Sequence, residues 1–279
     1  MNDVVLTLGT PNFSALHTPY IPSANIDKNY DIIKTIDLIY DFIHSIFAPS
    51  NKLINQNIKT MEQELNNIVN QMPRIGDTAP DFEAVTTKGN IRLSEYAKDK
   101  WIILFSHPAD FTPVCTTEMT GFAQRKPEFD ALNTELIGLS IDSIHAHLAW
   151  VNNVRENTGV YFDFPIIADI DMKVSKLYGM LQPNESETAA VRAVFFIDPN
   201  KKIRLVMYYP LNVGRNMDEI LRSLKALQVS DKNGVALPLN WVEGEKVIVP
   251  PPKNLEEMQE RIDGDYEEKV DFYLVKKSL

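Results

Sequence analysis

From about residue 80 onward, short apolar runs alternate with segments whose apolar residues recur at helical spacing. The runs are rich in β-branched and aromatic residues, which predicts strands at residues 101–105, 136–141, 164–168, 189–197 and 203–209. Helices are predicted after the capping residues Thr112, Ser143 and Asn216. The second should run to about residue 157 with Leu148 and Val151 facing inward, and the third to about residue 228. A turn signal at residues 198–200 joins the last two strands into a hairpin. Strands that alternate with helices, together with one hairpin, indicate an α/β domain with a mixed sheet.

Residues 1–73 do not follow this pattern and are predicted to form an N-terminal extension. Three prolines and the absence of a period indicate an irregular arm to about residue 29. Apolar residues then share one face of a predicted helix at residues 31–47, and a second helix at residues 54–72 has coiled-coil spacing. Two interpretations stay open: a helical hairpin packed on its own domain, or an oligomerisation element.

Residues 229–279 are predicted to be a C-terminal arm that follows a globular domain of residues 74–228. Prolines at positions 238 and 250–252 favour an extended course, and Asn254 is positioned to cap an acidic helix at residues 255–262. Because such a segment has little core of its own, we expect it to pack against another part of the protein.

The only cysteine, Cys115, lies where a strand leads through a loop into a helix. Thr112 is a good N-cap and Pro113 suits the first helical position, so Cys115 becomes the third helical residue. An N-cap hydroxyl bonds the N–H at that position, which predicts that the Thr112 oxygen lies near the sulfur. The positive end of the helix dipole favours a thiolate over a thiol, so the segment is predicted to carry a reactive sulfur.

A lone cysteine is more commonly a small buried hydrophobic residue, and the strand–loop–helix context is what favours the reactive interpretation here. A structural zinc site needs several ligands, and no second cysteine exists. A cysteine–histidine hydrolase using His107 would also need an orienting group and an oxyanion hole, and neither is visible in the sequence.

A second candidate is Arg192, which interrupts an otherwise apolar predicted strand. Burying a guanidinium without an anionic or hydrogen-bonding partner is costly. Either the residue lies at an edge with its tip in water, or the thiolate of Cys115 is its partner. His145 and His147 lie two residues apart on a predicted helix, so they point in different directions. We expect both at the surface and no joint metal site there.

The composition narrows the classes of partner and compartment. The net charge is −10, with 28 basic against 38 acidic residues, which argues against nucleic acid or an anionic membrane surface. No apolar run approaches the roughly 18 residues of a membrane span. The N-terminus shows neither a secretory signal nor a transit-peptide composition, and a single cysteine favours a reducing compartment. A cytoplasmic protein is expected.

The segment from Ser106 to Glu118 resembles the active-site signature of the one-cysteine peroxiredoxins, within the alkyl hydroperoxide reductase/thiol-specific antioxidant family. The core of that signature, Pro-x-x-x-Thr-x-x-Cys, falls on Pro108, Thr112 and Cys115. Further segments resemble the same subfamily in the same order: residues 76–82, 191–195, 209–216, 235–241 and 247–252. The resemblance runs from about Arg74 to near the C-terminus and leaves out the N-terminal extension.

This resemblance implies a thioredoxin-like fold and a thiol-dependent peroxidase that reduces hydrogen peroxide and organic hydroperoxides. The Cys115 thiolate would become a sulfenic acid, with Thr112 and Arg192 holding the peroxide oxygens and Pro108 shielding the site. Substrate-binding roles are expected for Arg192, Arg215, His107 and Glu118. No metal, flavin or haem is required, because sulfur supplies the electrons.

The resemblance also implies an external thiol reductant, since the chain has no resolving cysteine, and a homodimer wrapped by the C-terminal arm. A ring such as a decamer is the larger assembly to consider. The alternative function is a peroxide sensor or a chaperone-like oligomer that is switched by oxidation of Cys115.

Overall fold

The computed structural model describes residues 38–39, 58–61 and 72–279, and the chain divides into two units, residues 1–63 and 64–279. Leu38 and Ile39 are helical, as are residues 58–61, and both pieces lie inside the helices predicted for the N-terminal extension. The rest of the predicted arm and helical hairpin lies outside the described residues.

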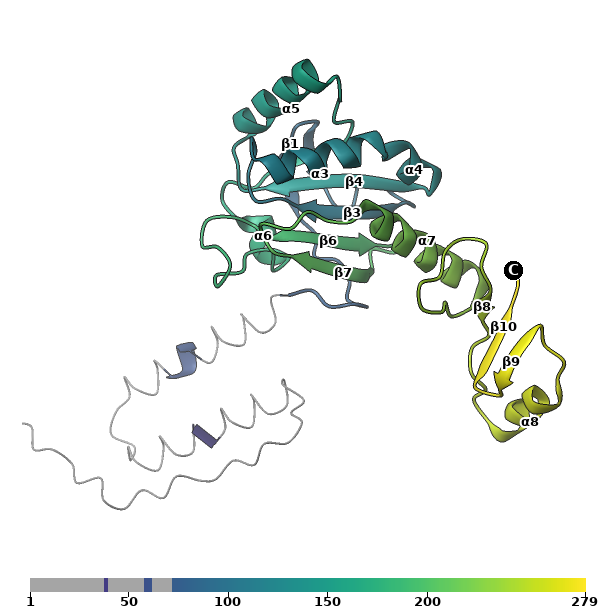
Figure 1. Ribbon diagram of the computed structural model, residues 1–279. Helices are drawn as coiled ribbons and strands as arrows, with labels where there is room; N and C mark the ends of the chain where they lie inside the picture. The colour runs from purple at the N-terminus through teal and green to yellow at the C-terminus, as the bar shows by residue number, and fades with distance from the viewer. Residues whose placement is uncertain (1–37, 40–57, 62–71) are drawn as a thin grey trace, which may run out of the picture. The chain divides into compact units, whose positions relative to one another are not determined.

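The core of the second unit is a seven-stranded mixed sheet with the order β2-β1-β5-β4-β3-β6-β7 (Figure 1). Strands β3, β4 and β5 are parallel, whereas β6 is antiparallel to both β3 and β7. This confirms the predicted α/β class and the β6–β7 hairpin, although the first of those strands begins at Arg192 and not at residue 189. The strands are β1 Glu83–Thr86, β2 Gly89–Arg92, β3 Trp101–Ser106, β4 Thr134–Ser140, β5 Ile166–Ala168, β6 Arg192–Ile197 and β7 Ile203–Tyr209.

Helices cover both faces of the sheet. Their bounds are α3 Pro113–Gln124, α4 Lys126–Ala131, α5 Ile144–Thr158, α6 Lys173–Leu177 and α7 Met217–Asn233. Alternate residues of β3 point to opposite faces. Ile103 and Phe105 join a core cluster with residues of α3, α4, α5 and α7, whereas Ile102 and Leu104 join a second cluster with α6. Helix α3, which carries Cys115, therefore lies on the face that residues of α4, α5 and α7 also cover.

Two predicted helices need correction in detail. In α5, Leu148 was expected to face inward but is 49% exposed, because the buried stripe of this helix runs through Trp150 and Val154. Helix α7 was expected to end near residue 228 but continues to Asn233, where Gly234 takes the left-handed conformation. The additional turn is stabilised by Val229, which packs against a small cluster around Trp241.

The C-terminal region contains structure that the sequence did not indicate. Helix α8, Leu255–Asp263, is capped by Asn254 as predicted. A second sheet, with the order β8-β10-β9, was missed; its strands are β8 Val247–Ile248, β9 Glu268–Asp271 and β10 Leu274–Lys277. Its neighbouring core is small and consists of Val235, Trp241 and Val247 with a few partly buried residues. Leu239, at 90% exposed, and Leu255, at 78%, remain uncovered among the described residues.

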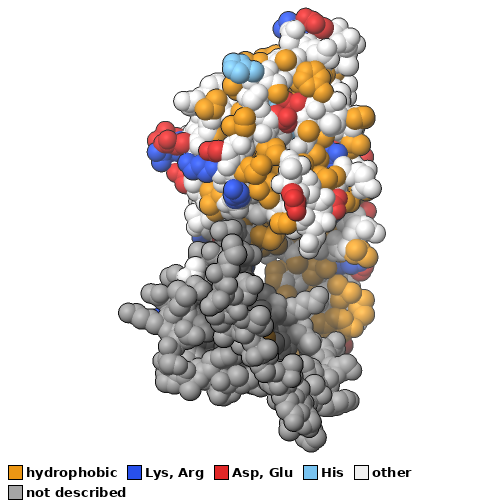
Figure 2. Space-filling view, turned by 90° about the vertical axis from the view of Figure 1, so that its left-hand side faces the viewer, with side chains coloured by type: hydrophobic (Ala, Val, Ile, Leu, Met, Phe, Trp, Pro, Cys, Tyr) orange, Lys and Arg blue, Asp and Glu red, His pale blue; other side chains and the backbone are white. Residues whose placement is uncertain are grey.

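Figure 2 shows one face of the protein, on which hydrophobic side chains lie interspersed with polar surface and charged groups. Among the described residues, no helix is both long and apolar enough to cross a membrane.

Candidate active site

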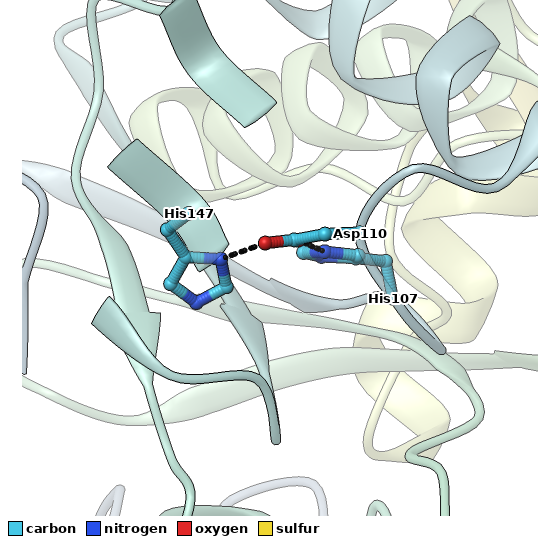
Figure 3. A group of neighbouring side chains, drawn as sticks. All are labelled: His107, Asp110 and His147. Carbon is cyan, nitrogen blue, oxygen red and sulfur yellow. Dashed lines mark hydrogen bonds and ion pairs between the residues drawn. The ribbon is translucent and has the colours of Figure 1, made fainter. Parts of the chain in front are cut away.

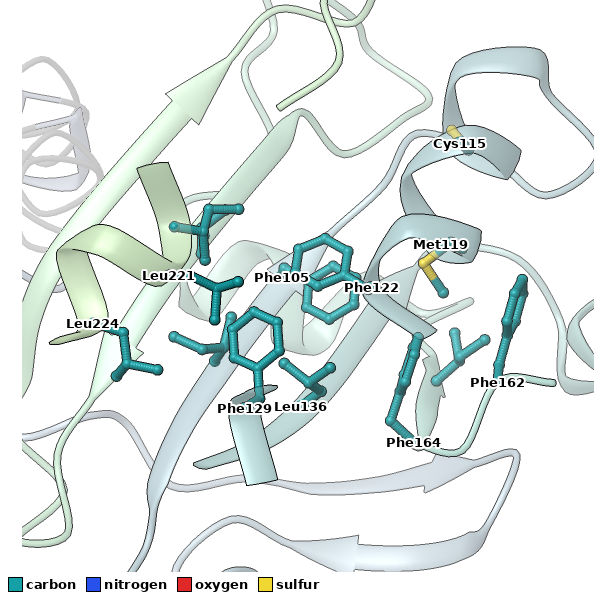
Figure 4. Packing of buried hydrophobic residues seen from close by; sticks show 14 of the residues in the cluster. Phe105, Cys115, Met119, Phe122, Phe129, Leu136, Phe162, Phe164, Leu221 and Leu224 are labelled. Carbon is teal, nitrogen blue, oxygen red and sulfur yellow. The ribbon is translucent and has the colours of Figure 1, made fainter. Parts of the chain in front are cut away.

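Strand β3 leads through a loop into α3, the helix that carries Cys115. Every residue of β3 is buried, and the loop that follows it carries His107 to Thr112. Phe111 adopts φ +55°, a left-handed conformation that is uncommon for a bulky residue, directly before the N-cap. Pro113 occupies the first turn of α3, and Cys115 is the third helical residue, as predicted. Figure 4 shows Cys115 in the first turn of α3, at the end of the packed core.

The predicted cap bond between Thr112 and the Cys115 N–H is wrong. Thr112 is the N-cap, but its hydroxyl donates to the carbonyl oxygen of Ala109 at 2.9 Å, and no side-chain cap bond forms. The physical reason is that the tight loop before the helix uses this hydroxyl to close itself. Because the hydroxyl hydrogen is committed to Ala109, the oxygen of Thr112 can act toward a ligand only as an acceptor.

Cys115 is 0% exposed. Burial alone does not show whether a cysteine is reactive or inert, so the groups next to the sulfur have to decide. The decisive neighbour is Arg192, whose Nη1 lies 3.4 Å from the sulfur. Arg192 is 2% exposed on β6, an interior strand of the sheet, so the interpretation of an edge arginine with its tip in water is wrong. Its Nε and Nη2 donate to the carbonyl oxygen of Leu211 at 3.0 and 2.6 Å, which fixes the guanidinium plane.

Glu118, one helical turn after the cysteine, joins the two arginines into one buried group. Its Oε2 accepts from Nη1 of Arg192 at 2.6 Å and from Nη2 of Arg215 at 2.8 Å. Its Oε1 accepts from the backbone N–H and the Nε of Arg215. Burial alone would raise the pKa of Glu118, but Arg215 and Arg192 outweigh it and hold that pKa below its ordinary value. Glu118 is therefore a carboxylate at neutral pH.

Arg215 itself does not contact the sulfur. Its Nη1 donates to the carbonyl oxygens of Ser106 and Ala193, both at 2.9 Å, and its guanidinium lies over the rings of Phe105 and Phe122. Two buried guanidinium groups against one carboxylate leave a single positive charge beside the thiol. Through Arg192, this net positive charge lies next to the Cys115 sulfur.

The loop histidine belongs to a second buried group, which Figure 3 shows with Asp110 between two imidazole rings. Nε2 of His107 lies 3.0 Å from Oδ1 of Asp110, and Nδ1 of His147 lies 2.7 Å from Oδ2. The prediction that His147 lies at the surface is wrong, because its side chain is 0% exposed, whereas His145 is exposed as predicted. Among the described residues, no hydrogen bond joins His107 to Cys115 or Arg192.

The ligand-type atoms of these three residues lie within 4.8 Å of one another, a spacing that a metal ion could use. The contacts of Asp110 with both rings have the lengths of hydrogen bonds, and the remaining nitrogen of His147 lies 3.0 Å from the carbonyl oxygen of Ile167. The geometry is therefore that of a hydrogen-bonded chain.

Comparison with known proteins identifies the family. The AhpC/TSA family model matches residues 75–206, and that of the C-terminal domain of 1-Cys peroxiredoxin matches residues 226–264. A peroxiredoxin of Methanosarcina mazei is 51% identical over 214 residues, which cover 74% of this chain and 98% of that protein. The chain belongs to the peroxiredoxin family. A peroxiredoxin of Aquifex aeolicus is 48% identical over 218 residues, 75% of this chain and 98% of its own.

Solved structures are similar to this peroxiredoxin over the same region. A yeast mitochondrial 1-Cys peroxiredoxin superposes with a TM-score of 0.67 at 44% identity and covers 75% of this chain and 100% of its own. A cysteine-to-serine mutant of peroxiredoxin 6 from Arenicola marina has a TM-score of 0.65 at 34% identity, covering 74% and 97%. These similarities confirm the thioredoxin-like fold and, with the single cysteine, the one-cysteine subfamily.

As a one-cysteine peroxiredoxin, the protein is a thiol-dependent peroxidase. It reduces hydrogen peroxide and organic hydroperoxides through a cysteine sulfenic acid and depends on an external thiol to return to the reduced state. Sequence reasoning missed three residues that shape the site: Asp110, His147 and Leu211. Asp110 lies inside the signature segment and was a signal that the sequence offered, because an aspartate in a buried loop requires partners.

Proposed function

We propose that Cys115 is the peroxide-reducing cysteine and that Arg192 is its principal electrostatic partner. The observation that carries this assignment is the 3.4 Å approach of the Arg192 Nη1 to the Cys115 sulfur, inside a strand that is otherwise apolar. A buried guanidinium beside a buried sulfur favours the thiolate and offers N–H donors to oxygen atoms that carry developing charge.

In the proposed step, the thiolate of Cys115 attacks the nearer oxygen of the hydroperoxide. An S–O bond forms and the O–O bond breaks, so sulfur loses two electrons and the hydroperoxide gains them. The departing oxygen takes up a proton and leaves as water or an alcohol. Arg192 and the N–H groups of the first turn of α3 stabilise the charge that grows on this oxygen, and the Thr112 oxygen accepts a hydrogen bond from the hydroperoxide.

The supporting residues have distinct proposed roles. Glu118 and Arg215 hold the guanidinium of Arg192 in place through a buried charge network. Pro108, which is half-buried in the loop, limits access of bulk water, and His107 lines the approach for the hydroperoxide.

Reduction of the sulfenic acid is proposed to need two equivalents of an external thiol. The first thiol displaces water to give a mixed disulfide with Cys115, and the second releases the Cys115 thiol. Because the yeast mitochondrial relative is resolved through glutathione/thioredoxin systems, glutathione and thioredoxin are the donors to test first.

The wider setting is proposed as a cytoplasmic homodimer in which the C-terminal arm, residues 229–279, covers a partner subunit. Exposed apolar side chains on this arm, including Leu239, Leu255 and Val270, support a covering surface. A decameric ring is the larger assembly to test, and measurement of the mass in solution distinguishes monomer, dimer and ring.

The test is steady-state peroxide consumption with a panel of thiols, for wild type and Cys115→Ser. Repeated turnover that is lost in Cys115→Ser supports the proposed assignment. A peroxide sensor or chaperone-like oligomer would instead react once and change its assembly without sustained turnover.

A further inference from the structure

The chain from His147 through Asp110 to His107 joins three separate segments of the protein. His147 comes from α5, Asp110 and His107 come from the loop before α3, and the Nε2 of His147 reaches the carbonyl oxygen of Ile167 in β5 at 3.0 Å. The side chains of the three residues are 0%, 2% and 0% exposed. The three side chains are therefore shielded from bulk solvent, and the hydrogen bonds within the group indicate where their protons lie.

The proton count follows from the partners. The carbonyl of Ile167 can only accept, so the Nε2 of His147 carries a hydrogen. One further proton lies between His147 and Asp110, and one between Asp110 and His107. Three hydrogen bonds require three protons, but two neutral imidazoles and a carboxylate bring only two. The group therefore holds one extra proton and has no net charge.

The surroundings locate this extra proton on His147. Burial alone would raise the pKa of Asp110, but the hydrogen bonds from His107 and His147 hold it below its ordinary value. Burial lowers the pKa of His107 despite Asp110, and the charge of Arg215 acts in the same direction. The Nδ1 of His107 is also buried without a hydrogen-bond partner among the described residues. Asp110 is thus a carboxylate and His107 is neutral with its hydrogen on Nε2, so the hydrogen-bond count leaves the extra proton to His147, whose two ring nitrogens each face an oxygen acceptor.

Asp110 also fixes the backbone of the loop that leads to Cys115. Its N–H donates to Oδ2 of Asp142 at 3.0 Å, and the same oxygen is held by the hydroxyl of Ser140 at 2.6 Å. The next residue, Phe111, has the strained φ of +55°. A residue in that conformation keeps it only when its surroundings hold it, and the contacts of Asp110 supply that hold.

We propose that His147 is a positioning residue of the peroxidase: as a buried imidazolium it holds Asp110, and through Asp110 it fixes the loop before Cys115 and keeps His107 as the Nε2–H tautomer. The part that concerns His107 rests on its proposed place in the site. The part that concerns the loop depends only on the established activity of the protein.

The first experiment compares three variants of the full chain. His147→Leu removes both ring hydrogen bonds and the charge, whereas His147→Asn keeps an amide N–H that can donate to Asp110. His145→Leu is the matched control, since His145 lies on the same helix and is exposed. We expect His147→Leu to lower the second-order rate of reaction with hydrogen peroxide by about 10- to 100-fold through misplacement of the loop. His147→Asn should recover most of this loss, and the control should match wild type.

The pH profile separates positioning from a general loss of packing. In His147→Leu the only charge partner left to Asp110 in this group is His107, so His107 should become titratable. The rate should then show a new inflection between about pH 5 and 8, which wild type and His145→Leu lack.

The second experiment is ¹⁵N NMR of the histidine ring nitrogens in the reduced wild-type protein, without peroxide. We expect one histidine that is protonated on both nitrogens at pH 8, assigned to His147 by its absence from His147→Asn, and His107 with its hydrogen on Nε2. This measurement does not involve turnover, so its outcome is independent of the roles proposed for His107 and Arg192. A neutral His147 at pH 7, or His147→Leu with the rate and pH profile of His145→Leu, would overturn the proposal.

Discussion

Replacing Glu118 with glutamine removes the negative charge that pairs with the two buried arginines, Arg192 and Arg215. The substitution keeps the shape of the side chain but replaces one carboxylate oxygen with an NH2 group. Each oxygen of Glu118 accepts two hydrogen bonds from arginine or backbone donors. Whichever oxygen is replaced, the new NH2 group therefore faces donors, and two guanidinium groups remain buried without a counter-charge.

The expected loss of stability follows from this geometry. Breaking a buried ion pair on one side costs about 3–5 kcal/mol, and a domain of this size loses about 2–4 °C of Tm per kcal/mol, so Tm should fall by about 6–20 °C. The remaining amide oxygen of the variant still accepts hydrogen bonds, and Arg192 and Arg215 keep their bonds to backbone carbonyl oxygens. The lower half of that range is therefore expected.

Glu128→Gln is the matched control. Glu128 also binds an arginine through both oxygens, with distances of 2.6 and 2.9 Å to Arg125, but the two side chains are 47% and 32% exposed. An exposed pair contributes about 0–1 kcal/mol, so the Tm of this variant should fall by no more than about 4 °C.

The pKa of Glu118 determines how the difference in Tm between wild type and Glu118→Gln should change with pH. Because the folded protein holds the pKa of Glu118 below the ordinary value of 4.5, the ion pair contributes fully above pH 4.5 and is lost as the pH falls through the folded pKa. A protonated glutamic acid resembles glutamine, so the difference in Tm between wild type and Glu118→Gln should narrow below pH 4.5. Thermal unfolding followed by circular dichroism across pH 3.5–8, in the presence of a reductant, measures it. Equal losses for Glu118→Gln and Glu128→Gln at pH 7 would refute the reasoning.

Four further outcomes are expected. Cys115→Ser should abolish peroxide consumption and keep the circular dichroism spectrum; more than a few per cent of the wild-type rate would contradict the thiolate mechanism. Arg192→Met should lower kcat/KM for peroxide by about 10²–10³-fold, as loss of an oxyanion donor does, while Arg204→Met, on the neighbouring strand and partly exposed, should stay within twofold (about 0.4 kcal/mol). One equivalent of peroxide should give a monomeric band on non-reducing gels and a trappable sulfenic acid at Cys115. Excess peroxide should add the mass of two oxygens to Cys115. A quantitative disulfide dimer would show instead that the Cys115 sulfurs of two subunits can meet. Deleting residues 1–73 should change the number of subunits in solution or the solubility while keeping turnover. The same subunit count and stability as the full chain would show that the extension is dispensable.

The fold could be predicted where the local sequence is compatible with only one type of secondary structure. The apolar run that became β6 and the turn at residues 198–200 determined a hairpin, and Ser143 and Asn216 marked helix starts because their side chains satisfy free N–H groups. Arg192 was recognisable for the same kind of reason, since a guanidinium inside an apolar strand requires a buried partner. The partner could not be read locally, because Leu211 and Glu118 reach Arg192 from distant parts of the chain.

The wrong predictions concern segments whose local sequence is compatible with more than one structure. Thr112 had the sequence of a capping residue, but its hydroxyl can donate backward to Ala109 or accept forward from the helix, and the tight loop favours the first. The small C-terminal sheet was missed because β8 has two residues and β9 is exposed throughout, so neither shows the alternation that identifies a strand.

The misplacement of His147 has the most instructive cause. Helix α5 offers two adjacent stripes, one through Leu148 and Val151 and the other through His147, Trp150 and Val154. Hydrophobicity alone favours the first, but tryptophan buries more apolar area than leucine, so the stripe that contains Trp150 faces the core. A histidine three residues before a buried tryptophan lies on the same face of the helix, and His147 is buried beside Trp150. A buried imidazole with an acceptor on each nitrogen needs an acidic partner, and Asp110 was the aspartate in the signature loop. The contact between His147 and Asp110 could therefore have been predicted from the sequence, if Trp150 had been recognised as the buried residue of this helix.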